Sequence, residues 1–291
     1  MNIGFIGLGV MGGPMAGHLA AAGHRVRGFD LTPGAAAARG LETAESAADA
    51  ARDADVVFTM LPHGGAVRGV VEESLAGAMA PGALLVDCSS AEPWLTTGTA
   101  ALLEARGVGM VDAPVSGAGW GAEAGELVFM CGGAEADMAR IAPLLDAMGR
   151  KTFHVGPLGA GHAMKTINNV ITAMAVVSTT EAMLIGKAWG LIPSVMADVL
   201  NVSTGQSFWT TERLHQDVLN RKFEDGFKLE LMLKDVRIAN RLGRDQGLDL
   251  PMLALGERLW EQADRDLGPA RAVTEMVRWC ETQIGGTLRD D

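Results

Sequence analysis

The sequence predicts an α/β domain built on a doubly wound parallel sheet, followed by an all-α domain that is joined to it through a long helix. Up to about residue 160, short apolar runs alternate with segments of helical periodicity. The next segment, 162–189, is helical in pattern and contains no proline, and no strand pattern follows it. Alternating strands and helices are typical of βαβ units in a parallel sheet. We therefore expect a first domain at 1–160 and an all-helical second domain at 161–291.

Each predicted strand is a short apolar run without polar alternation, as expected when both faces of a sheet are buried. The strands are predicted at 2–9, 25–30, 55–61, 83–89, 109–115, 126–133 and 152–156. The helices between them are predicted at 14–23, 44–53, 67–79, 94–107 and 136–149. In the second domain, helices are predicted at 162–189, 193–202, 209–221, 227–247, 251–266 and 269–283. We expect the apolar surface of the helix at 162–189 to form a homodimer or homotetramer interface.

Composition excludes several classes of function. The 291 residues carry a net charge of −11, and no basic face suited to nucleic acid is visible. No apolar stretch is long enough to predict a membrane-spanning segment. The three cysteines are far apart and the six histidines lack ligand spacing, so we expect no disulfide and no metal, in a reducing cytoplasm. The chain has no tyrosine, so no tyrosine hydroxyl can serve as general acid or base.

A glycine-rich turn follows the first predicted strand and precedes the first helix. It consists of Gly7, Leu8, Gly9, Val10, Met11 and Gly12. In this GxGxxG pattern, the first glycine allows a tight turn, the second lets a pyrophosphate approach the backbone, and the third lets the helix pack closely on the strand. The helix N-terminus also favours phosphate. The alternative is a tight βα turn with no ligand, but the context favours a Rossmann-type dinucleotide site.

Asp30 bears on the choice of cofactor. It ends the second strand, 18 residues beyond Gly12, where a carboxylate can accept a hydrogen bond from the adenosine ribose 2′-hydroxyl. A 2′-phosphate would meet a like charge there, and 31–33 supplies no arginine to hold it. The sequence therefore favours NAD over NADP.

Two further strand ends are candidates for the cofactor groove. Leu61 and Pro62 end the third strand and Ser90 follows the fourth. Ligands in open α/β sheets bind at the carboxyl ends of strands. Ordinary strand-to-helix turns would explain these residues equally well.

Lys165, Asn168 and Asn169 lie near the start of the long helix. Spacings of three and four place the lysine and both amides close to one face. Their neighbours are apolar, and a partly desolvated lysine is more easily deprotonated, so that it could take a proton from an alcohol as hydride leaves. The alternative is an exposed lysine beside surface amides.

Two other segments carry candidate residues. The glycine-rich loop from Ser116 and Gly117 to Gly121 could hold a substrate carboxylate, or could be a structural turn. Lys234 and Asp235 lie in a predicted helix, where a solvated charge pair is the simpler interpretation.

Five blocks in order cover essentially the whole chain: GFIGLGVMGGPMAGHLAAAG (4–23), DCSSAEP (87–93), DAPVSGAGWGAEAGEL (112–127), GAGHAMKTINN (159–169) and LMLKD (231–235). Together they resemble the β-hydroxyacid dehydrogenase family, which includes 3-hydroxyisobutyrate dehydrogenase and tartronate semialdehyde reductase.

The resemblance implies a role for each matching position. Lys165 matches the catalytic lysine of the family, and Asn169 matches the amide that supports this lysine and the substrate. Ser116 and Gly117 match the loop that binds the substrate carboxylate. The remaining matches concern the cofactor: the Gly7–Gly12 turn, Pro62, Ser90 and Lys234.

The chain departs from the family pattern at four positions. Ala118 stands where a second glycine is common, and Trp120 is a bulky addition to the same loop. His18 replaces a usual asparagine and Ser90 a usual threonine. Because the loop decides substrate fit, the resemblance does not predict a named substrate.

We therefore hypothesise an NAD-dependent oxidoreductase that converts a small β-hydroxyacid, similar to 3-hydroxyisobutyrate, into a semialdehyde. The first alternative is a reductase of tartronate semialdehyde or of a sulfonated analogue. The second is a non-catalytic dinucleotide-binding module, against which the intact Lys165 and Asn169 argue.

Overall fold

The computed structural model describes residues 1–290, which form two compact units. The first unit is Met1–Lys165, and the second begins at Thr166. The first is a mostly parallel sheet covered by helices and the second is helical, which confirms the predicted fold class.

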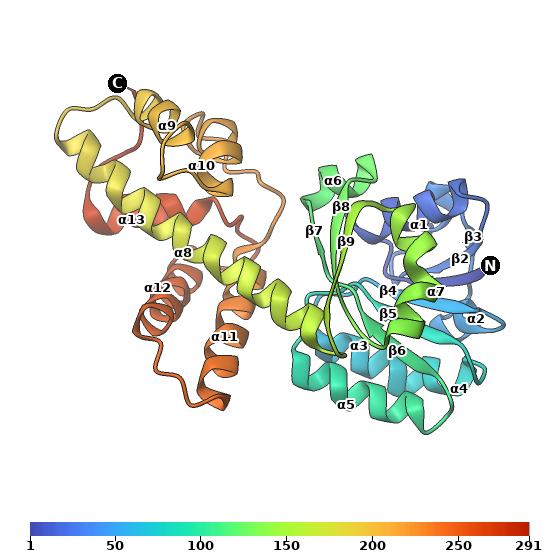
Figure 1. Ribbon diagram of the computed structural model, residues 1–291. Helices are drawn as coiled ribbons and strands as arrows, with labels where there is room; N and C mark the ends of the chain where they lie inside the picture. The colour runs from blue at the N-terminus through green and yellow to red at the C-terminus, as the bar shows by residue number, and fades with distance from the viewer. Residues whose placement is uncertain (291) are drawn as a thin grey trace. The chain divides into compact units, whose positions relative to one another are not determined.

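The sheet of the first unit has nine strands in the order β3-β2-β1-β4-β5-β6-β8-β7, with β9 paired to β8 (Figure 1). The strands are β1 (Asn2–Ile6), β2 (Arg25–Phe29), β3 (Glu42–Thr43), β4 (Val56–Thr59), β5 (Leu84–Asp87), β6 (Gly109–Asp112), β7 (Val115–Ser116), β8 (Leu127–Gly132) and β9 (Gly149–Gly156). Strand order reverses between β1 and β4, because the chain builds the sheet outward in both directions from these two strands. This reversal is the switch point at which such sheets bind ligands.

Helices cover both faces of the sheet. They are α1 (Gly12–Ala21), η1 (Ala37–Arg39), α2 (Ala47–Ala51), α3 (Gly64–Val70), η2 (Val71–Leu75), α4 (Ala76–Ala78), α5 (Pro93–Glu104), α6 (Ala118–Ala124) and α7 (Glu135–Asp146). Two buried apolar clusters lie on opposite faces. Phe58 packs with α1 and α7 in one cluster, whereas its neighbour Val57 packs with α2, η2 and α5 in the other. Adjacent strand residues point to opposite faces, which explains why the strands lack polar alternation.

The sheet departs from the predicted all-parallel arrangement at one edge. Strand β8 runs antiparallel to β6 and β7. The connection from β7 to β8 contains only the short helix α6, which sequence analysis did not predict, and a parallel crossover needs a longer connection. The predicted strand at 109–115 is divided into β6 and β7 at Pro114, which has no N–H to donate to a ladder.

The second unit contains α8 (Ala160–Ala188), which starts in the first unit, then α9 (Pro193–Asn201), α10 (Phe208–Glu212), η3 (Leu214–Val218), α11 (Leu229–Asp245), α12 (Pro251–Leu267) and α13 (Glu275–Ile284). These helices enclose one buried cluster that includes Trp209 and Trp260. The predicted helix at 269–283 is wrong in its first six residues. There, Val273 N–H donates to Phe227 carbonyl and Leu229 N–H to Arg271 carbonyl, so the segment pairs as a short bridge before α13 begins.

Helix α8 is the one helix among the described residues that is long and apolar enough to cross a bilayer, with a mean hydropathy of 1.4 over its most apolar window. Core helices of soluble proteins pass the same test. Val170, Ala173 and Val176 of α8 are buried in the cluster of the second unit, and this packing accounts for part of its apolar character, since 44% of that window is buried.

Candidate active site

The glycine-rich turn has the geometry of a phosphate cradle. Gly7 has a φ of +93°, and a Cβ there would lie 2.3 Å from the carbonyl oxygen of Met60. A Cβ on Gly12 would lie 1.9 Å from the carbonyl oxygen of Gly7, so neither position admits a side chain. A Cβ on Gly9 would meet nothing within 4 Å. The turn is therefore closed on its protein side and open at Gly9, which fits the approach of a pyrophosphate.

The start of α1 favours an anion for a second reason. The residue that precedes the helix, Met11, supplies no side-chain cap. The first N–H groups of an α-helix have no partner within the helix, and the positive end of its dipole attracts negative charge. A dinucleotide phosphate would satisfy both demands.

Asp30 is tied to this turn. Its carboxylate accepts hydrogen bonds from Leu8 N–H and Thr32 N–H, each at 2.7 Å. Partial burial would raise the pKa of Asp30, but the N–H groups of Thr32 and Leu8, with the Thr32 hydroxyl, outweigh it, and the net pKa is lowered. The carboxylate therefore stays ionised and in place beside the turn, as an acceptor for ribose hydroxyls requires.

The ends of β4 and β5 lie next to each other, since Thr59 pairs with Asp87 in parallel register. A Cβ on Gly7 would also lie 3.1 Å from Leu61, so Leu61 borders the turn. Leu61 N–H donates to the buried Ser89 hydroxyl at 2.9 Å. Pro62 is exposed and Ser90 half-buried at the same edge. The structure thus brings Leu61 to the glycine turn, and Pro62 and Ser90 follow the ends of the neighbouring strands β4 and β5.

The segment predicted as a glycine-rich loop forms helix α6, which approaches the glycine turn from another side. A Cβ on Gly119 would lie 2.8 Å from the Val10 side chain. His18 of α1 contacts the carbonyl oxygen of Ala122 through its Nε2 at 3.0 Å, so this departure from the family pattern joins α1 to α6.

Ser116 is the last residue of β7, where it pairs with Val128 of β8 and is half-buried. Gly117 follows at a φ of +139° and Ala118 at +53°. The non-glycine residue Ala118 therefore occupies the left-handed region at the position where the family commonly has glycine.

The start of α8 is fixed by a buried carboxylate. Asp112 ends β6, is 0% exposed, and accepts hydrogen bonds from the N–H groups of Gly159 and His162, each at 2.7 Å. A Cβ on Gly161 would lie 2.3 Å from the Met130 carbonyl oxygen, so the helix start sits directly on the sheet. Burial raises the pKa of Asp112, although the charge of His162 and the N–H groups of Gly159 and His162 act in the opposite direction. This cap holds the start of α8 at the end of β6.

His162 is completely buried near the start of α8. Its Nδ1 lies 2.7 Å from the Thr96 hydroxyl, and its ring lies 3.7 Å from the Asp87 carboxylate and 3.8 Å from that of Asp112. No group of His, Cys, Asp and Glu in residues 1–290 is arranged to hold a metal ion. The ring therefore fills a polar space under α8.

Lys165 and Asn169 lie one turn apart on α8. Lys165 is half-buried. Among the apolar neighbours expected to desolvate it, Val170 is buried, whereas Ile167 and Ile171 are 47% and 64% exposed. The apolar face predicted around the lysine is thus only partly enclosed.

Asn169, Lys234 and Asp235 meet inside the second unit. Asp235 is 0% exposed; its Oδ2 accepts a hydrogen bond from Asn169 Nδ2 at 2.5 Å, and its Oδ1 lies 2.9 Å from Lys234 Nζ. The Lys234 side chain is only 18% exposed, so the interpretation of a solvated charge pair is wrong. The structure joins two predicted site residues, Asn169 and Lys234, through a carboxylate that had no predicted role.

Sequence analysis missed both buried carboxylates, although one left a signal. Met232 and Ala239 are buried on one face of α11, and Asp235 lies three residues after the first and four before the second, which is helical spacing. A charge at a position that the periodicity assigns to the core indicates a paired group. Asp112 left a weaker signal, because an aspartate at the end of a strand is also an ordinary turn residue.

Two family models match the chain. Residues 2–156 match a model described as the NAD binding domain of 6-phosphogluconate dehydrogenase. Residues 159–280 match one described as NAD-binding of NADP-dependent 3-hydroxyisobutyrate dehydrogenase.

Individual relatives cover almost the whole chain. The 2-(hydroxymethyl)glutarate dehydrogenase of Eubacterium barkeri is 36% identical and covers 98% of this chain and 96% of its own. The NAD-dependent L-serine dehydrogenase of Pseudomonas aeruginosa is 38% identical and covers 89% and 91%. The structure of Mycobacterium tuberculosis 3-hydroxyisobutyrate dehydrogenase with L-serine has a TM-score of 0.87 and 34% identity, and covers 96% and 98%.

Proposed function

Because this chain belongs to the β-hydroxyacid dehydrogenase family and is an NAD-dependent oxidoreductase of small carboxylates, we propose that it oxidises a short acid of the form HOCH₂–CHR–COO⁻ to the corresponding semialdehyde. The compounds in the names of its relatives support this substrate class. L-Serine, 3-hydroxyisobutyrate and 2-(hydroxymethyl)glutarate all carry a primary hydroxyl on the carbon next to C2 and differ only in the group R. The shared chemistry therefore lies in the hydroxyl and the carboxylate.

The observation that carries the proposal is the position of Lys165 and Asn169, one turn apart on a helix whose start is fixed by Asp112. Lys165 accepts the hydroxyl proton as the carbonyl forms, which is the role of a general base. Asn169 holds the hydroxyl oxygen and keeps it near Lys165. When bound, NAD supplies the acceptor for the hydride that leaves the hydroxyl carbon.

The end of β7 and the start of α6 supply the carboxylate contacts and the selectivity for R. Ser116 and Gly117 bind the carboxylate through the hydroxyl and the main chain. Ala118 and Trp120 lie in the first turn of α6, and Trp120 is 55% exposed, so it is available to contact R. A bulky indole here favours a small R.

The cofactor residues are the glycine turn, Asp30, Leu61, Pro62, Ser90 and Lys234. The glycine turn holds the pyrophosphate, and Asp30 accepts from the ribose hydroxyls. Arg39, the first arginine after β2, forms a solvent-exposed ion pair with Glu123 at 2.9 Å. The preference for NAD therefore rests on the Asp30 carboxylate, which would repel a 2′-phosphate.

The test is NADH formation from 3-hydroxyisobutyrate, L-serine, 2-(hydroxymethyl)glutarate and glycerate, with Lys165→Ala and Lys151→Ala as matched lysine variants. We expect turnover of at least one acid, a loss of about 10²–10⁴ in kcat for Lys165→Ala, and no change for the exposed Lys151→Ala. Near wild-type turnover by Lys165→Ala would overturn the mechanism. NAD should exceed NADP in kcat/KM, and Asp30→Ala should narrow that gap.

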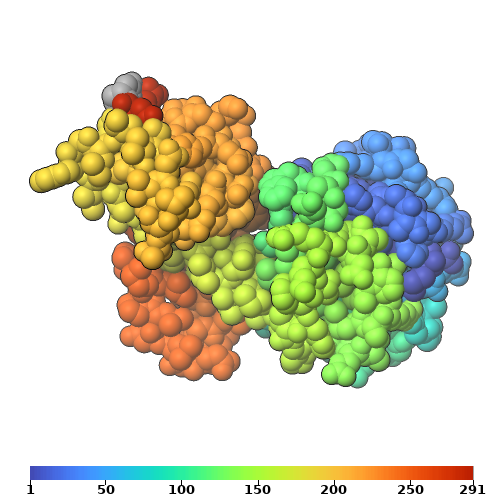
Figure 2. Space-filling model, turned by 45° about the horizontal axis from the view of Figure 1, so that its top comes forward, coloured from blue at the N-terminus to red at the C-terminus, as the bar shows by residue number. Residues whose placement is uncertain are grey.

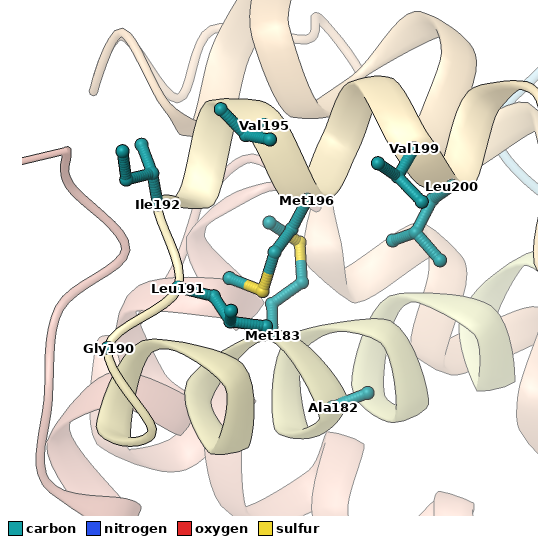
Figure 3. A pocket seen from close by; sticks show the side chains of 9 residues that line it. All are labelled: Ala182, Met183, Gly190, Leu191, Ile192, Val195, Met196, Val199 and Leu200. Carbon is teal, nitrogen blue, oxygen red and sulfur yellow. The ribbon is translucent and has the colours of Figure 1, made fainter.

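We also propose that the enzyme is a homo-oligomer, and that the apolar surface of α8 and α9 forms its interface. Ile185, Trp189 and Val202 are 72%, 85% and 87% exposed. A groove of about 510 Å³ lies beside them (Figure 3) and is lined only by apolar residues and glycine: Ala182, Met183, Gly190, Leu191, Ile192, Val195, Met196, Val199 and Leu200. This segment, yellow in Figure 2, lies on the surface of the chain.

Exposed apolar residues beside an apolar groove mark an interaction site, and most soluble oligomers pair identical surfaces. The occupant that we propose is therefore a second copy of this chain. Sedimentation analysis should show a dimer or tetramer, and Trp189→Ser with Val202→Ser should shift it toward monomer. A monomeric wild type would contradict the proposal.

A cytoplasmic location is proposed from the thiols. Cys88, Cys131 and Cys280 are all free and buried. Burial is the main cause that raises the pKa of Cys131 and of Cys280 to about 12. Such thiols are unreactive, as suits a protein that relies on no disulfide.

A further inference from the structure

We propose that Asp235 is a positioning residue that couples the cofactor lysine, Lys234, to the substrate amide, Asn169. The inference rests on the roles proposed above for Lys234 and Asn169. We refer to the three residues as the Asp235 triad. The coupling means that a change at the cofactor contact, Lys234, alters the affinity for the substrate, and that a change at the substrate contact, Asn169, alters the affinity for the cofactor.

Each carboxylate oxygen of Asp235 is engaged by a different functional side chain. Oδ2 accepts the hydrogen bond from Asn169 Nδ2, and Oδ1 lies 2.9 Å from Lys234 Nζ. Helix α8 supplies the amide and helix α11 supplies the acid and the lysine. One buried group therefore holds both the amide and the ammonium.

The contacts fix which way the Asn169 amide faces. An ionised carboxylate only accepts hydrogen bonds, so the NH₂ end of the amide must face Asp235. Asn168 Nδ2 donates to Asn169 Oδ1 at 3.1 Å, which holds the other end. An amide of this kind retains one N–H and one lone pair for a ligand. Asp235 thus determines which end of Asn169 meets the substrate hydroxyl.

Burial makes the two contacts dependent on each other. Asp235 is 0% exposed, so bulk water does not replace a partner that moves away. A buried ion whose partner leaves is costly, and its remaining hydrogen bonds strengthen in response. When a ligand draws the Lys234 ammonium toward itself, the carboxylate therefore pulls harder on Asn169. By thermodynamic linkage, the factor by which bound cofactor changes the affinity for substrate equals the factor by which bound substrate changes the affinity for cofactor.

Stability alone does not account for a charge at this position. Asp235 lies among Met232, Val236 and Ala239 on the buried face of α11. Replacing buried ion pairs by well-packed apolar side chains is often neutral or stabilising. An aspartate here serves the two side chains that it holds.

The experiment measures how a substitution at the contact for one ligand changes the binding of the other ligand. We call each such change a cross-effect. Lys234→Met should raise the substrate KM, and Asn169→Ala should raise the Kd for NADH, measured by NADH fluorescence, each roughly tenfold. Both variants are then repeated in an Asp235→Asn background. A neutral amide there cannot serve both partners, so each cross-effect should fall to less than about twofold.

The matched control is Asn240→Leu. Asn240 is a buried polar residue of the same helix, and its Nδ2 donates to the Leu253 carbonyl and to Glu257 at 2.9 and 2.7 Å. This variant should lower the melting temperature and leave both KM and the Kd for NADH unchanged. Thermal unfolding of every variant shows that it is folded at the assay temperature.

Two outcomes overturn the coupling: an unchanged Kd for NADH in Asn169→Ala, or cross-effects that persist in full in the Asp235→Asn background. The NADH measurement needs no turnover. If the wild type oxidises none of the acids tested, the proposed substrate class fails, and the fluorescence titration still decides the coupling.

Discussion

Two buried carboxylates, one in each unit, contact the start and the third turn of α8 and have different roles. Asp112 accepts hydrogen bonds from the main-chain N–H groups of Gly159 and His162. Asp235 holds the side chains of Asn169 and Lys234. Both are 0% exposed, so burial does not distinguish them. The difference between main-chain and side-chain partners predicts that Asp112 determines stability and Asp235 determines kinetics.

The largest expected effect is that of Asp112→Ala. Two buried N–H groups lose their acceptor, and each unsatisfied group costs about 1–3 kcal/mol. The unfolding free energy of the first unit should therefore fall by roughly 2–5 kcal/mol, measured by urea unfolding. Asp112→Asn keeps one carbonyl oxygen and should lose about half as much. Wild-type stability in Asp112→Ala would contradict the role assigned to Asp112, because main-chain capping would then not explain the burial of this carboxylate.

His162→Leu should have the next largest effect. The substitution removes the ring from Thr96 Oγ1 and leaves the carboxylate of Asp87 facing an apolar side chain. It keeps the main-chain N–H that Asp112 accepts. We expect a loss of about 1–3 kcal/mol, read as a lower melting temperature. His162→Gln should recover part of the loss, since an amide can reach Thr96. An equal loss of stability in both variants would show that the shape of the His162 ring, and not its polarity, matters at this buried position.

Asp112 and Asp30 should affect the pH dependence of folding stability in opposite directions. The pKa of Asp30 is lowered in the folded state, so its contribution to stability is present above its unfolded pKa and lost as the pH falls through the folded value. Burial raises the pKa of Asp112, so the folded state takes up this proton first and gains stability relative to the unfolded chain as the pH falls.

Unfolding free energies of wild type, Asp30→Asn and Asp112→Asn between about pH 7 and pH 3 test this difference. The advantage of wild type over Asp30→Asn should shrink on acidification. The difference between wild type and Asp112→Asn should move in favour of wild type. Slopes of the same sign in both comparisons would contradict the direction assigned to one of the two groups.

The sequence was sufficient to predict the structure where a local residue pattern allows only one backbone conformation. The turn at Gly7–Gly12 is an example, because the close approach of Met60 and Gly7 carbonyl oxygens admits no side chain at Gly7 or Gly12. The start of α8 near 160 was also accessible, since periodicity does not depend on distant residues. Asn169 and Lys234, by contrast, are 65 residues apart and meet only through Asp235. No pattern within either helix encodes that contact, and the same holds for the antiparallel β8, whose direction depends on the length of its connection.

The smallest effect concerns Ala118, which combines a main-chain feature with a position beside the proposed carboxylate-binding residues. Its φ of +53° costs an L-residue roughly 1 kcal/mol, and glycine removes this cost. Glycine also gains about 0.4–1 kcal/mol of entropy in the unfolded chain, so Ala118→Gly should change the unfolding free energy by less than about 1 kcal/mol. Its effect should instead appear in KM, because a less restricted backbone at Ala118 holds Ser116 and Gly117 less firmly.

Ala124→Gly is the matched control, since Ala124 is in the same helix α6. This variant should lose about 0.5–1 kcal/mol of unfolding free energy with no change in KM. If Ala118→Gly destabilised the protein as much as Ala124→Gly and left KM unchanged, the residue would belong with Asp112, as part of the main-chain framework, and not with the side chains that select the substrate.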